Sequence, residues 1–99
     1  MPRGGTLDVL LVATRRFEFH AFLARSLAAV GASVGAVAPP GSPLFRTGAV
    51  TTRFAVRGGR RVGGMERALA DTHPTVVVPC DDGATAALHA LDERSDDWR

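Results

Sequence analysis

The sequence has no lysine, a single cysteine and no long apolar run, and each absence narrows the possible functions. Without lysine the chain cannot carry a phosphate-binding loop of the G-x-x-x-x-G-K-[ST] type. One cysteine, Cys80, cannot form an internal disulfide, which fits a reducing cytoplasm. No apolar stretch approaches the roughly 20 residues needed to span a bilayer, and the first residues lack a signal-peptide core. We therefore expect a cytoplasmic protein with no membrane partner.

The charged residues are unevenly distributed along the chain. Residues 1–70 carry ten arginines against three acids, whereas residues 71–99 carry seven acids against two arginines. A GC-rich coding bias accounts for the all-arginine, alanine-rich composition. No aromatic side chains lie between the arginines to stack on bases. Residues 57–61, R-G-G-R-R, are interpreted as a solvated surface loop, with phosphate binding as the alternative. Nucleic acid is thus ranked last among the possible partners.

Ninety-nine residues predict one domain, covering 1–99, and its elements alternate between strand and helix. The run at 8–13 is almost wholly apolar, as is typical of a strand covered on both faces. The expected order is a strand at 8–13, a helix at 17–30, strands at 33–38 and 51–56 with a helical turn from Ser42 between them, a helix at 65–71, a strand at 75–79 and a helix from Ala84 to about Glu93. The sequence therefore predicts an α/β, Rossmann-like three-layer domain with a four-stranded parallel sheet in the order 3-2-1-4.

Several residues mark the ends of these elements. The first helix has large apolar residues at helical spacing, at 19, 22, 23, 27 and 30, and Gly31 is its expected left-handed stop. Pro39 and Pro40 end the second strand, because proline cannot donate to a sheet ladder. Asp82, or the turn before it, is expected to cap the last helix.

The turns after the first and fourth strands are the predicted ligand site, because these strands are neighbours at the switch point of the sheet. One turn supplies Thr14, Arg15 and Arg16, and the other supplies Asp81 and Asp82. Guanidinium groups suit carboxylate or phosphate, and paired carboxylates suit an amine, so the set suits a zwitterionic or amino-acid-like ligand. The alternative is that an arginine of the first turn pairs with an aspartate of the second and holds the two turns together.

Other sites are not indicated by the residues. The turn after the first strand contains no glycine, which excludes the dinucleotide-binding fingerprint. His20, His73 and His89 are scattered along the chain, and a surface or partly buried role is favoured for His20. Cys80 follows a strand and precedes two acids, which disfavours its thiolate and makes it a small apolar filler. No catalytic residue, metal ligand or cofactor site is therefore assigned to this chain.

The order of short motifs resembles the N-terminal pre-ATP-grasp domain of ATP-grasp proteins of the carbamoyl-phosphate-synthase-like and carboxylate–amine ligase type. The matching segments, within residues 7–92, are D-V-L-L-V with a T-R turn, G-A-S-V-G-A-V, P-P-G-S-P-L, T-R-F-A-V and H-P-T-V-V-V-P with two aspartates. Thr75 stands where the family usually has aspartate. The motifs are short and apolar-rich, so their specificity is moderate.

The resemblance implies a substrate-side domain that is not catalytic alone. In the parent ligase, ATP and magnesium would bind in a C-terminal ATP-grasp domain that this chain does not contain, and a carboxylate would be activated as an acyl phosphate. Thr14, Arg15, Arg16, Asp81 and Asp82 would then face the cleft that holds a small-molecule substrate.

Two features also favour a fragment of a longer protein. The helix from Ala84 has no glycine or proline stop, and Trp98 lies one residue from the end. The alternative function is a stand-alone α/β binding or regulatory module for a small anionic or zwitterionic ligand.

Overall fold

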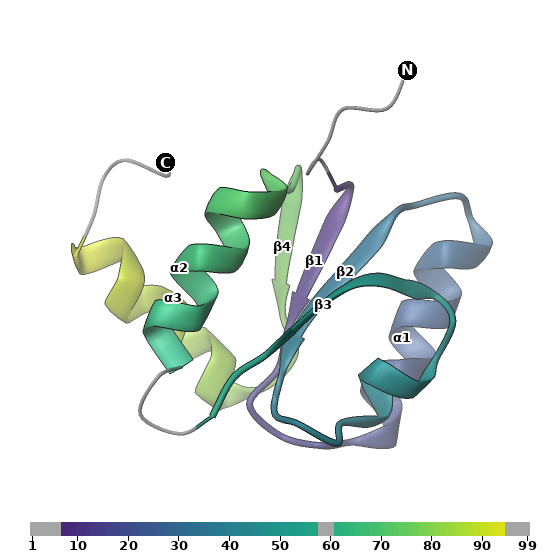
Figure 1. Cartoon of the computed structure of the whole chain (residues 1–99), viewed down its shortest axis with the longest axis horizontal. Coiled ribbons are helices and arrows are strands. Elements are labelled where there is room, and N and C mark those ends of the chain that lie inside the picture. Colours follow the sequence, from purple (N-terminus) through teal and green to yellow (C-terminus); the bar gives the residue numbers. More distant parts are fainter. Residues whose placement is uncertain (1–6, 58–60, 95–99) are drawn as a thin grey trace.

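The computed structural model describes residues 7–57 and 61–94, which form a three-layer α/β domain (Figure 1). Strands and helices alternate as their patterns predict, with a short 3-10 helix, η1, after the second strand. The elements are β1 (Val9–Val12), α1 (Glu18–Ala29), β2 (Val34–Ala38), η1 (Pro43–Arg46), β3 (Val50–Ala55), α2 (Arg61–Thr72), β4 (Val76–Pro79) and α3 (Asp82–Arg94).

The four strands form one parallel sheet in the order β3-β2-β1-β4, which confirms the predicted topology. The central strand β1 has Val9 opposite Val34 of β2 on one side and opposite Val76 of β4 on the other. β3 and β4 are the edge strands. Because β1 and β4 are parallel neighbours, the turns that follow them emerge at the same edge of the sheet.

Helices cover both faces of the sheet (Figure 1). Side chains alternate between these two faces along each strand, so the core is divided into two parts. Leu10 and Val12 of β1 face α2 and α3, where they pack with Met65. Leu11, on the opposite face, packs with α1 and with Leu44 of η1. The residues on both faces of β1 are buried, as its apolar run predicts.

The buried side of α1 differs from what its large apolar residues suggest. The helix itself is confirmed, and Gly31 ends it at a φ of 95°, in the left-handed region. Its buried residues, however, are His20, Ala21 and Ala24, so the surface or partly buried position predicted for His20 was wrong. Small side chains let α1 lie close to the sheet, and its largest apolar residues then remain outside.

The remaining elements follow the predictions with two differences. Ser42 caps η1 by accepting a hydrogen bond from the Leu44 amide, as expected for a serine before proline. α2 begins at Arg61 rather than at residue 65, so the last residue of the loop predicted at 57–61 is helical; residues 58–60 of that loop lie outside the described residues. α3 begins at Asp82 rather than Ala84. Trp98 also lies outside the described residues.

No helix within the described ranges is long and apolar enough to cross a bilayer.

Candidate functional site

The β1 and β4 turns meet at the carboxyl edge of the sheet, as predicted. Val12 is opposite Pro79 at the ends of the two strands, and the amide of Cys80 continues the pairing by donating to the Val12 carbonyl at 2.8 Å. This pairing fixes the position at the edge of the sheet where the turns after β1 and β4 begin. It brings Thr14 and Asp81 into direct contact although 67 residues separate them in sequence.

The carboxylate of Asp81 is the centre of this contact. Its Oδ2 accepts from the Thr14 amide at 2.8 Å and from the Arg15 amide at 3.2 Å. Its Oδ1 accepts from the Thr14 hydroxyl at 2.7 Å and from the Ala84 amide at 2.8 Å. The last bond caps the N-terminus of α3. One side chain therefore joins the β1 turn, the β4 turn and the start of α3.

These hydrogen bonds set the protonation of Asp81. Partial burial by itself raises the pKa of the carboxyl group, but the bonds from Thr14, Ala84 and Arg15 favour the ionised form more strongly. The net result is a pKa below the ordinary value of 3.8. Asp81 is thus a carboxylate at neutral pH, and its acceptor positions are used by its own chain.

A close approach of backbone to side chain completes this joint. Gly83, in the first turn of α3, lies directly against Thr14, and an added Cβ would meet the Thr14 side chain, with the Thr14 Cβ 3.1 Å away. Real Cβ atoms are rarely found at such distances, so a larger residue at position 83 would push Thr14 away from Asp81.

The other predicted site residues lie around this joint. The alternative in which an arginine pairs with an aspartate was wrong: within residues 7–57 and 61–94, neither Arg15 nor Arg16 forms an ion pair with Asp81 or Asp82. Arg16 turns away and its Nε donates to the Pro40 carbonyl at 2.7 Å, which links the β1 turn to the turn after β2. Arg15 and Asp82 are exposed.

The resulting edge presents exposed groups of both charges. The Arg15 guanidinium is available for a carboxylate or phosphate, and Asp82 is available for an amine. Asp81, in contrast, is a structural residue. The predicted five-residue set is therefore brought to one edge, where its members differ in what they can contact.

Comparison with protein families, with curated proteins and with solved structures finds no match.

Cys80, beside the joint, is expected to react slowly with thiol reagents. Burial, and then the negative charge of Asp81, raise its pKa to about 11. At pH 8 we expect its alkylation by iodoacetamide to be at least about a hundredfold slower than that of a free cysteine, because the thiolate is so much rarer. Rates measured in buffer and in urea provide the comparison. A rate in buffer equal to that of the unfolded chain would contradict a partly buried thiol with a raised pKa.

His20 is the buried polar residue that the sequence pattern missed. It is 1% exposed, its Nδ1 has no hydrogen-bond partner in the described structure, and its ring lies edge-on to that of Phe17 at 5.4 Å. Its spacing of four from Ala24 places both on one helix face, which is the signal that could have found it.

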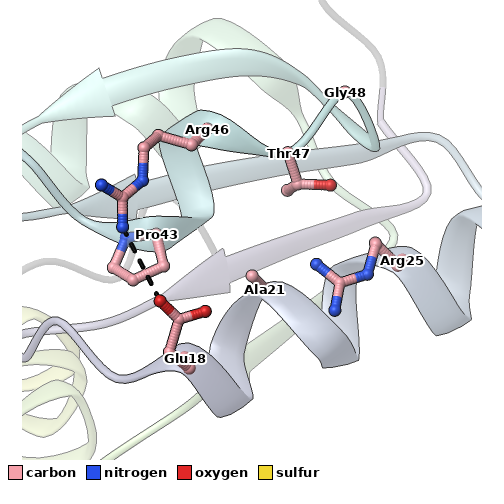
Figure 2. Close-up of a pocket in the computed structure, with 7 residues that line it drawn as sticks. All are labelled: Glu18, Ala21, Arg25, Pro43, Arg46, Thr47 and Gly48. Carbon is pink, nitrogen blue, oxygen red and sulfur yellow. Dashed lines mark ion pairs between the residues drawn. The ribbon is translucent and has the colours of Figure 1, made fainter.

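A charged pocket between α1 and η1 was also missed. Its charged lining residues are Glu18, Arg25 and Arg46 (Figure 2). The spacing of seven between Glu18 and Arg25 puts them on one side of α1, but nothing in the sequence indicates that η1 returns to face them.

Proposed function

We propose that this chain is the N-terminal, substrate-side domain of an ATP-dependent ligase of the ATP-grasp type, not catalytic on its own. The observation that carries the proposal is the Asp81 joint, which holds the turn bearing Arg15 at the carboxyl edge of β1 and β4. This is the edge where open parallel sheets bind ligands. Arg15 would contact an anionic group of the substrate, and Asp82 would contact an amine, while Arg16 is held by the Pro40 carbonyl.

The order of motifs gives further support. The S-P-L segment forms the start of η1, the R-F pair lies in β3, and the three valines before Pro79 form β4. Each motif thus lies on an element of the type that the resemblance implies.

The described residues at this edge do not themselves fit ATP or magnesium. The Thr14-Arg15-Arg16 turn has no glycine that would bring backbone amides close to a phosphate, and the carboxylate of Asp81 is engaged by its own chain. We therefore place both in a partner ATP-grasp domain and assign them no step here.

An exposed aromatic surface on α1 is consistent with such a partner. Phe19 is 64% exposed and Phe22 is 57% exposed, with ring centroids 6.3 Å apart. Clustered large apolar side chains on a surface mark interaction sites more often than isolated ones do. We propose that this surface contacts the remainder of the enzyme.

The proposal is tested by two measurements. Titration calorimetry of the isolated chain with ATP and magnesium should show no saturable heat. An antibody against this domain should detect, in native cell extract, a product several times heavier than 10.4 kDa. Micromolar ATP binding by the isolated chain, or a native product of 10.4 kDa that purifies as a monomer, would overturn the proposal.

A stand-alone binding module is the second candidate, favoured by the exposure of opposite charges, Arg15 and Asp82, at one edge. Dye binding separates the two. For a domain that lacks its partner, we expect the native chain to bind a hydrophobic dye strongly, and the double variant Phe19→Ser/Phe22→Ser to lose most of that fluorescence with an unchanged melting temperature. Ala70→Ser on α2 is the control. Weak dye binding by the native chain would favour the module.

A further inference from the structure

The pocket between α1 and η1 is a second site, separate from the Asp81 joint. Its volume is about 390 Å³, within the usual range for small-molecule sites. α1 contributes Glu18, Ala21 and Arg25, while η1 and the loop after it contribute Pro43, Arg46 and Thr47 (Figure 2).

Three charged side chains dominate the pocket, two arginines and one glutamate, so its net charge is +1 when all are ionised. The Arg46 Nη2 lies 3.7 Å from the Glu18 Oε2, longer than a hydrogen bond, and these side chains are 71% and 83% exposed. Such a pair contributes little and is easily exchanged for a ligand. In the described part of the chain, Arg25 has no carboxylate within ion-pair distance.

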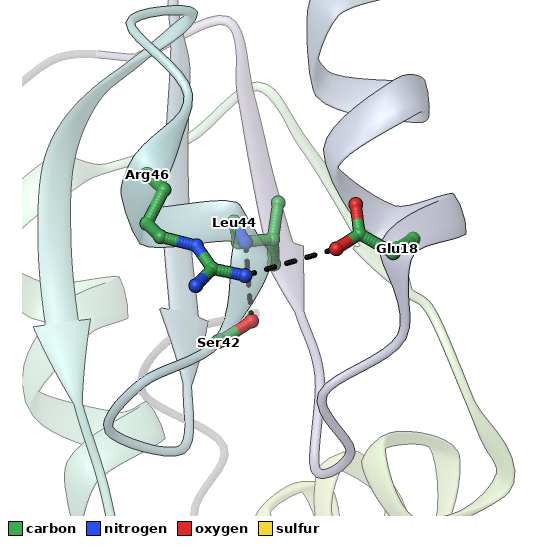
Figure 3. A network of polar contacts seen from close by, with 4 residues as sticks. All are labelled: Glu18, Ser42, Leu44 and Arg46. Carbon is green, nitrogen blue, oxygen red and sulfur yellow. Dashed lines mark hydrogen bonds and ion pairs between the residues drawn. The ribbon is translucent and has the colours of Figure 1, made fainter.

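The backbone around these side chains is fixed by buried contacts. Ser42 caps η1 through its 3.2 Å bond from the Leu44 amide, and Leu44 is fully buried against α1 (Figure 3). Ala21, also buried, holds the helix wall in place. The two walls are thus formed before any ligand binds, and only the long charged side chains have to adjust.

The polar groups that line the pocket indicate the chemical class of ligand it would bind. Guanidinium groups bind carboxylates through paired hydrogen bonds. Arg25 and Arg46 would each bind one carboxylate group of a ligand. The Thr47 hydroxyl oxygen accepts from the Ala49 amide at 3.3 Å, so its proton can be donated to a bound carboxylate. The Glu18 carboxylate would accept from an ammonium group.

We propose that the α1–η1 pocket binds an acidic α-amino acid. This ligand carries two carboxylates and one ammonium group, so its charge of −1 at neutral pH complements the pocket. A dicarboxylate without the ammonium would bring a carboxylate towards Glu18 with nothing to offset the repulsion. A monocarboxylate would leave one arginine unpaired.

The test is a titration of the ¹⁵N-labelled chain with L-glutamate at constant ionic strength, followed by NMR. We expect saturable shifts of the Ala21 and Gly48 amides at millimolar glutamate, with glutarate binding at least about fivefold more weakly, since it lacks one ion pair. Arg25→Gln should weaken glutamate binding by a similar factor. Arg53→Gln, an exposed arginine of β3 outside the pocket, should not change it.

A steric variant provides a readout that does not depend on charge. A Cβ on Gly48 would meet no atom within 4 Å, so Gly48→Leu can place its side chain in the open space at the pocket without a clash. We expect it to prevent binding with an unchanged melting temperature. The proposal is overturned by an absence of saturable shifts, by equal binding of glutarate, or by shifts centred on Thr14 and Arg15. None of the pocket residues belongs to that edge, so the result is independent of the proposed ligase function.

Discussion

Replacing Asp81 by alanine is expected to destabilise the domain by about 2–4 kcal/mol. The substitution removes the cap of α3, worth about 0.5–2 kcal/mol, and leaves the part-buried Thr14 amide without its acceptor. It also releases Arg15, so the predicted ligand-binding turn should lose its position. Urea unfolding at pH 7 measures the loss, and the amide shifts of residues 14 and 15 report the local effect.

The loss of unfolding free energy caused by Asp81→Ala should depend on pH. Because the pKa of Asp81 is lowered in the folded state, its carboxylate contributes stability above the unfolded pKa of about 3.9. That contribution is lost as the pH falls through the lower pKa of the folded state. The difference in unfolding free energy between wild type and Asp81→Ala should therefore shrink below about pH 4.

The adjacent aspartate is the matched control. Asp82 is exposed at the start of α3, and its charge only favours the helix dipole. We expect Asp82→Ala to have a much smaller effect than Asp81→Ala at every pH. Equal losses from the two substitutions would mean that general negative charge at this turn, and not the four hydrogen bonds of Asp81, stabilises the joint.

Replacing Leu10 by alanine is expected to cost about 2–5 kcal/mol, the range for a buried leucine whose removal leaves a cavity. Leu10 is fully buried in the central strand, where it packs with residues of α2 and α3. A domain of this size has about 5–15 kcal/mol of stability, so the variant could be largely unfolded at 37 °C. Thermal and urea unfolding followed by circular dichroism would measure the loss.

The edge strand offers the comparison for Leu10. Val76 is opposite Val9 in the same sheet but is 48% exposed. Val76→Ala should therefore cost under about 1 kcal/mol, because little apolar surface is lost from the core. Similar losses from both variants would contradict a core centred on β1.

The fold could be predicted from the sequence because its signals are local. The apolar run of β1, the double proline at 39–40 and the glycine at 31 each determine the type or the end of an element. The alternation of strand and helix then leaves few parallel topologies. Helical spacing in α1, however, gives the period and not the buried side. Ala21 and Ala24 face the sheet because small residues allow close packing, and the phenylalanines stay outside.

The candidate site was predicted less completely than the fold. The strand order was enough to bring the two turns together, but the donors that Asp81 would accept from depend on the register of β1 against β4. That register is set by packing along both strands and is invisible in either turn alone. In place of the ion pair that was the alternative at this edge, Asp81 is bound by backbone amides, which lose no side-chain freedom on bonding.

The β4 edge of the sheet has a consequence for how copies of the domain can associate. In a parallel strand, alternate amides point to the same side, and Val76 and Cys80 both donate to β1. The backbone nitrogens of Val77 and Pro79 therefore point away from β1. Of these two residues, only Val77 has an amide hydrogen, because proline has none. β4 presents a single outward donor, too few to template another strand. Concentrated solutions of this domain should thus show no addition of a further strand at the β4 edge.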